Sequence, residues 1–239
     1  MKLSEIFTQL AYGELVQMGV LNKTRDGILP AKYGQLVAHV NLGLNVLFKR
    51  FNLKESSTLI TLMASKLTYA LNTDSDTIFM ETMEIPEFKN NITKIERVYT
   101  SSDYELSLND ESDEYSCFTP ELTVLRVPLV ITKQSNDLPA DLKTKNLRIV
   151  YRASHPVIEY TSTGFNPALV EVELPSSHLE PLLYFIASRA NNPMGMSAGY
   201  HAGDGYFGKY EKACMELEVR NIRVDQGKQN SKLLMHGWV

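Results

Sequence analysis

Apolar residues recur at helical spacing in the first fifty residues of the chain. Ser4 is placed to cap a first helix, which the pattern extends towards Gly19. Pro30 favours the first turn of a second, more regular helix. The apolar face of this second helix follows three- and four-residue steps through Leu36, Val40, Leu44, Leu47 and Phe51. The pattern therefore predicts an N-terminal pair of helices over residues 1–55.

Helical spacing returns in the last third of the chain. Leu182 and Ile186 lie four residues apart on one apolar face, which predicts a third helix. The stripe resumes at Tyr206 and predicts a fourth helix that ends near Arg223. These two elements make residues 175–224 a C-terminal helical region that completes the helical core.

The middle of the chain, residues 56–174, has the shorter period of β-structure. Two short segments, residues 58–62 and 67–71, are expected to form a hairpin or a pair of edge strands, with a helix as the alternative because residues 63–66 do not break helices. Four further strands are predicted at Thr93 to Tyr99, Tyr104 to Leu108, Thr123 to Val127, and Leu147 to Tyr151. Because the strands are grouped and do not alternate with helices, the fold class is α+β. We expect a helical bundle with a central antiparallel β region.

The last fifteen residues form a segment of their own. Residues 225–231 are polar and have no apolar residue to bury, whereas the final eight become apolar again. These eight are Lys232, Leu233, Leu234, Met235, His236, Gly237, Trp238 and Val239, and they include the only tryptophan. Tryptophan is a preferred anchor at interfaces. Residues 225–239 are therefore predicted to be an extended docking tail, with folding back onto its own domain as the alternative.

Composition narrows the classes of function. The chain has 239 residues and a formal net charge of −4, so it lacks the positive field of a typical nucleic-acid binder. A protein that surrounds DNA without gripping it remains compatible. Cys117 and Cys214 have no ligand spacing, which favours free cysteines in a reducing compartment. Without a signal peptide or a membrane-length apolar run, we expect a soluble protein made in the cytoplasm.

A search for catalytic patterns predicts no catalytic, cofactor-binding or metal-binding residues. The five histidines, His39, His155, His178, His201 and His236, have no second histidine at helical ligand spacing. His155 follows a predicted strand and is placed to act as a general base, but a strand-end role is the commoner one. The glycine-rich residues 194–205 lack the order of a phosphate-binding loop. The chain is expected not to be an enzyme.

A second hypothesis concerns the β region. If this region were a host-surface or carbohydrate-binding module, its aromatic residues would gather on exposed strands. The candidates are Tyr99, Tyr104, Tyr115 and Phe118. This alternative predicts binding by the monomer.

Five segments in order carry a resemblance to a known family. They are residues 10–15, 39–51, 147–156, 182–189 and 236–239. In that order they resemble the head-to-tail adaptor proteins of short-tailed bacteriophages, also called connector or tail-tubular proteins. The resemblance spans nearly the whole chain, and its motifs are structural and not catalytic.

The resemblance implies a non-enzymatic virion protein of the tail or neck, assembled in the host cytoplasm. Such adaptors form a ring of twelve copies below the portal protein, and double-stranded DNA passes through the ring without sequence-specific binding. The C-terminal arm would reach the portal, and the helix faces of Leu36, Val40, Leu44, Leu47, Phe51, Leu182 and Ile186 would pack the ring. No cofactor and no membrane are implied. The β region is larger than in small adaptors, so its partner is open between tail nozzle, tail fibres and neighbouring copies.

Overall fold

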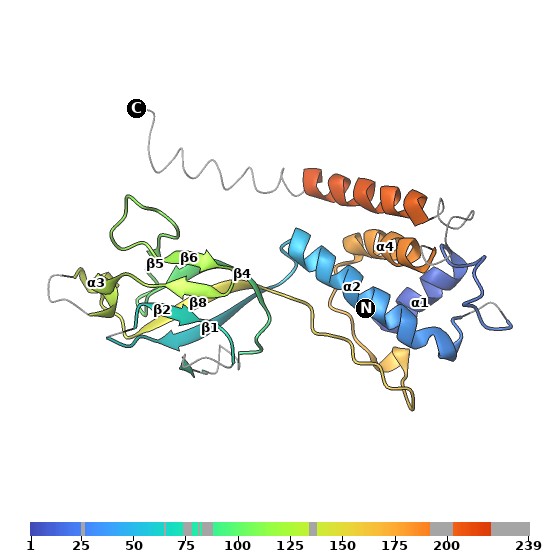
Figure 1. Ribbon diagram of the computed structural model, residues 1–239, viewed down its shortest axis with the longest axis horizontal. Helices are drawn as coiled ribbons and strands as arrows, with labels where there is room; N and C mark the ends of the chain where they lie inside the picture. The colour runs from blue at the N-terminus through green and yellow to red at the C-terminus, as the bar shows by residue number, and fades with distance from the viewer. Residues whose placement is uncertain are drawn as a thin grey trace. The chain divides into compact units, whose positions relative to one another are not determined.

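The chain folds as a mixed α+β protein of two compact units (Figure 1). The computed structural model describes residues 1–24, 27–64, 66–73, 78–80, 82, 88–133, 138–191 and 203–220. The helical unit consists of Met1–Leu47 and Val157–Val239, and the β unit is Phe48–Pro156. The β unit is thus inserted into the sequence of the helical unit.

The first helix, α1, is shorter than its apolar pattern predicts. It covers Leu3–Tyr12, with Lys2 and not Ser4 at the N-cap position. The N–H of Gly13 makes the last helical bond, to the carbonyl oxygen of Gln9, and the helix ends because the backbone of Gly13 leaves helical geometry and the chain continues in turns. The expected start at Ser4 and extension towards Gly19 were therefore wrong, whereas the helix itself is confirmed.

The second helix is confirmed where the sequence placed it. A 3₁₀ turn, η1 (Pro30–Lys32), leads into α2 (Tyr33–Arg50). Every residue of the predicted apolar face, Leu36, Val40, Leu44, Leu47 and Phe51, is buried. Gly43 allows close packing on the next helix, because a Cβ there would lie 2.6 Å from Cδ1 of Leu182.

The helical unit is organised around α4 (Leu179–Asn191), which follows the 3₁₀ turn η4 (Ser176–His178). Most of α4 is buried, and it contacts α1, α2 and a further helix over residues 203–220 (Figure 1). Its buried Ser188 and Asn191 donate to carbonyl oxygens of their own helix at 2.7 Å each. These bonds satisfy polar groups that burial would otherwise leave unpaired. An almost fully buried helix is the expected centre of a bundle.

A strap of irregular chain over residues 157–175 wraps the helical unit. Asn41 in α2 holds the strap, since its side chain accepts from the N–H of Ile158 and donates to the carbonyl oxygen of Ile158, each at 2.9 Å. Further along, Lys2 pairs with Glu171 at 2.8 Å, beyond the 3₁₀ turn η3 (Pro167–Leu169). Most of this strap was expected in the β region, but it belongs to the helical unit.

The β unit contains two antiparallel sheets. The five-stranded sheet has the order β3-β1-β8-β4-β5, and the three-stranded sheet has the order β2-β7-β6. The strands of the first sheet are β1 (Glu55–Thr61), β3 (Phe79–Met80), β4 (Ile92–Tyr99), β5 (Glu105–Leu106) and β8 (Asn146–Ala153). Those of the second are β2 (Thr68–Ala70), β6 (Phe118–Glu121) and β7 (Val124–Arg126), and short helices α3 (Leu129–Thr132) and η2 (Ala140–Leu142) follow. One apolar cluster draws on both sheets.

The four predicted strands of the β region are confirmed, whereas the hairpin offered for residues 58–71 was wrong; of the two edge strands offered instead, β2 lies at an edge and β1 does not. β1 and β2 do not form a hairpin, because β1 pairs with β8 and β3 while β2 pairs with β7. The pairing with the β8 segment continues one residue beyond β1, where the backbone N–H of Leu62 donates to the carbonyl oxygen of Lys145. Alternate residues of β8 are buried, as its sequence predicts for a strand with one solvated face.

Candidate functional site

The outer face of helix 203–220 is the candidate functional site. Met215 and Val219 on this helix are each 55% exposed. They are exposed because the opposite side of the helix is used for packing: Tyr210 and Cys214 are buried there. The amphipathic pattern thus places an apolar surface outward on a helix whose inner face already packs against the rest of the unit.

Charged residues border the apolar part of this face. A shallow groove of about 430 Å³ is lined by Lys212, Met215, Glu216, Val219 and Arg220. The charges alternate in sign at four-residue steps, and residues at this spacing lie on one side of a helix. Single exposed apolar residues are ordinary, but an apolar strip with a charged border is typical of protein contacts. The arrangement suits docking of another polypeptide and provides no catalytic group.

An aromatic cluster fixes the start of this helix. Nζ of Lys209 lies 5.0 Å from the ring centroid of Tyr206 and 5.7 Å from that of Tyr184. The hydroxyl of Tyr206 donates to the backbone oxygen of Glu14 at 3.3 Å. Burial, with the charge of Glu14, raises the pKa of Tyr206, so this hydroxyl stays a donor at neutral pH. The face is therefore presented on a rigidly held helix.

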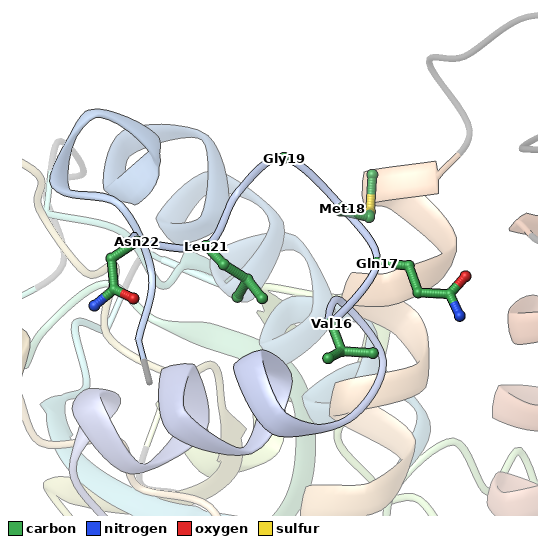
Figure 2. A pocket seen from close by; sticks show the side chains of 6 residues that line it. All are labelled: Val16, Gln17, Met18, Gly19, Leu21 and Asn22. Atoms are coloured by element: carbon green, nitrogen blue, oxygen red, sulfur yellow. The ribbon is translucent and has the colours of Figure 1, made fainter. Parts of the chain in front are cut away.

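A second hollow lies in the loop after α1. Its volume is about 600 Å³, and its lining comes from residues 16–22. Figure 2 shows that the side chains of Gln17 and Asn22 point in opposite directions, away from each other. A ligand site needs polar groups that converge, and this lining has neither convergence nor charge. The hollow is therefore a surface depression formed by the loop and not a candidate ligand site.

The structure places the residues predicted from sequence in different settings. The tail residues Lys232 to Val239 lie outside the described residues. The predicted ring-packing residues Leu36, Val40, Leu44, Leu47, Phe51, Leu182 and Ile186 are all buried within the chain. They stabilise the fold of one copy, so a neighbouring copy would contact exposed residues instead. Sequence reasoning missed Met215 and Val219, although their four-residue spacing was a signal for a second apolar strip.

The outer face of the five-stranded sheet carries arginines that are paired. Arg97 bonds Glu55 at 3.1 Å, and Arg148 bonds Asp103 at 2.6 Å. A third arginine of the same face, in β8, contacts Glu96. Pairing with carboxylates cancels the local positive charge that phosphates would seek. This face is therefore poorly suited to holding nucleic acid.

The candidate general base His155 and the cysteine Cys117 have structural surroundings. The buried ring of His155 packs edge-on against Phe48, with centroids 5.4 Å apart, and its Nδ1 lies beside the carbonyl oxygen of Pro156. Burial raises the pKa of the Cys117 thiol to about 12, which disfavours a nucleophilic thiolate. Within the part of the chain that the structure describes, no three His, Cys, Asp or Glu side chains are grouped to hold a metal ion.

The aromatic residues of the carbohydrate hypothesis lie on separate elements. Arg148 covers the ring of Tyr99 at 4.7 Å, and the hydroxyl of Tyr99 donates to Glu105. Tyr115 packs against the apolar cluster of the β unit, and Phe118 belongs to the three-stranded sheet. Tyr104 is about half exposed. The four rings therefore do not form one exposed platform.

Comparisons with known proteins give no family. No protein-family model matches the chain, and no curated protein matches it either. The likeness to phage adaptors therefore depends on the five segments named above. Among the described helices, none is long and apolar enough to cross a lipid bilayer.

Proposed function

We propose that this chain is a head-to-tail adaptor, a structural virion protein whose copies form a ring that joins the portal to the tail. The observation that carries the proposal is the exposed pair of Met215 and Val219 on a helix whose inner side is already packed. The five-segment resemblance supports it, because three of its segments fall largely in α2, β8 and α4, and residues 10–15 begin in α1.

A closed ring needs two different patches on each copy that meet around a rotation axis. In this proposal the outer face of helix 203–220 is one of these patches. Its apolar strip supplies contact area, and the alternating Lys212, Glu216 and Arg220 give register against a neighbour. The resemblance implies that the ring contains twelve copies.

The charge of the molecule agrees with a duct for DNA. Each fixed phosphate contact adds affinity and slows passage of the genome. A net charge of −4 and the carboxylate pairs of Arg97 and Arg148 keep such contacts few. Double-stranded DNA would therefore pass without sequence-specific binding. The tail residues 232–239 would bind the portal, and the β unit would face the tail nozzle or tail fibres.

Negative-stain imaging of the purified chain, alone and with a portal protein, tests the proposal. We expect rings in the presence of the portal, and we expect the double variant Met215→Glu and Val219→Glu to lose them. Leu169→Glu is the matched control, because Leu169 is 77% exposed in the same unit but belongs to a different element, the 3₁₀ turn η3. A chain that stays monomeric in every condition, portal included, would contradict the adaptor proposal.

The role of the tail is tested separately. Deletion of residues 226–239 should abolish or strongly weaken portal binding in a pull-down. Undiminished binding by the deleted chain would remove the tail from the portal interface and leave the ring proposal standing.

A further inference from the structure

The exposed face of helix 203–220 lies immediately before the apolar C-terminal segment in the chain. Met215 and Val219 are each 55% exposed, and the helix reaches residue 220. Beyond it follow a polar stretch and then Leu233, Leu234 and Trp238. We propose that in the free chain its own residues 232–239 dock on the outer face of helix 203–220.

The chain is long enough for this contact. From Lys212 to Arg220 the face spans about 12 Å, because an α-helix rises about 1.5 Å per residue. Residues 221–231 can extend about 36 Å, so they can return the apolar segment to any point of the face. A tether this short gives an effective concentration in the millimolar range, so even a weak contact is populated.

The chemistry of the two surfaces matches. The groove presents Met215, whose flexible thioether adapts to partners, beside Val219. The segment offers leucines and a large indole, which gain most from leaving water. Lys212 and Arg220 border the groove, and their aliphatic stems add apolar area. The hollow at residues 16–22 is a poorer receptor, because its side chains splay apart and polar groups form much of its wall.

Docking would control assembly. In this respect the inference depends on the proposed function: the docked segment covers the patch that a neighbouring copy needs. When a portal captures residues 232–239, the face becomes free for the next copy. Ring closure is thereby linked to portal binding, and free chains are kept from closing rings in solution.

Trp238 is the only tryptophan, so its fluorescence reports on the segment without labels. The emission maximum and acrylamide quenching of the full-length chain are measured at low concentration and compared with those of the chain in denaturant. We expect Trp238 to be shielded in the folded chain. Combined Met215→Glu and Val219→Glu should lower the ratio of docked to undocked segment by about tenfold or more, because the segment then buries less apolar surface on the face. Leu169→Glu should leave the shielding unchanged.

Solvent-like emission in the folded wild-type chain would overturn the docking, and so would shielding that the double variant leaves intact. Shielding that grows with protein concentration would overturn docking on the same chain and assign the face to a second copy. As a second measurement, deletion of residues 226–239 should accelerate hydrogen exchange in helix 203–220. Unchanged exchange would contradict the contact even if the double variant folded poorly.

The two proposals fail separately. Rings with a portal, together with a Trp238 that is never shielded, would refute the docking alone. A shielded Trp238 in a chain that forms no ring with or without portal would refute the adaptor proposal alone.

Discussion

One substitution made at two glycines should have different effects on stability. Gly43 lies in the middle of α2, where an added methyl group would sit 2.6 Å from Cδ1 of Leu182 and 3.0 Å from Cδ1 of Phe185. Both neighbours are buried in the core. Gly208 lies within helix 203–220, and a methyl group there meets no described atom within 4 Å. Alanine is the perturbation at each position.

The magnitudes follow from helix propensity and packing. Alanine is favoured over glycine inside a helix by about 1 kcal/mol, and this gain applies to both positions. At Gly43 the approach below 3 Å forces the core to shift, and overpacking of this kind costs about 1–3 kcal/mol. Gly208→Ala should therefore stabilise the chain by about 1 kcal/mol, while Gly43→Ala should be neutral or destabilise it by up to about 2 kcal/mol. The difference between the variants isolates the packing effect.

Denaturant unfolding followed by the helical circular dichroism signal measures this difference. The slope of unfolding free energy against denaturant should agree among both variants and the wild type, since the same surface is exposed. The reasoning is refuted if Gly43→Ala raises the unfolding free energy as much as Gly208→Ala does. In that case the α2–α4 contact at Gly43 would be loose.

Three further outcomes are expected. Asn41→Leu should destabilise the chain by about 2 kcal/mol and speed hydrogen exchange at Ile158, because it removes the hydrogen-bond partners of the Ile158 N–H and carbonyl oxygen. Unchanged exchange would contradict the anchoring role of Asn41. Burial, and then the charge of Arg189, lower the pKa of His39 in the folded chain from 6.5. Neutral His39 therefore favours the folded state above pH 6.5, and this stability is lost as the pH falls through the pKa of the folded chain. His39→Gln should reduce that acid sensitivity in urea midpoints measured across pH. With its pKa near 12, Cys117 should resist alkylation in the native chain and react on unfolding; rapid native labelling would count against its burial.

Long periodic elements were predictable from sequence. α2, α4 and β8 each repeat an apolar position over many residues, and the structure buries those positions. The two-residue strands β3 and β5 have no such repeat. The pairing of β1 with β8 was also beyond sequence reasoning, because it joins segments far apart in the chain. Local patterns indicate strands but do not select their partners.

The candidate site was less predictable than the fold. Periodicity marks residues that leave water, and it does not distinguish the core of one copy from a contact between copies. Leu44 and Leu182 therefore had the signature expected of ring packing and proved to be core residues. Met215 and Val219 are recognisable only once the other side of their helix is seen to be occupied.

The insertion of the β unit within the helical unit sets an order for folding during synthesis. Residues 48–156 leave the ribosome as a complete unit before α4 has been made, so the two sheets can close first. Until then α1 and α2 have no central helix on which to bury their apolar faces. The helical unit can therefore complete its core only after the end of α4 has been synthesised. A nascent chain halted before residue 179 should hold a folded β unit and an N-terminal helix pair that chaperones can still bind.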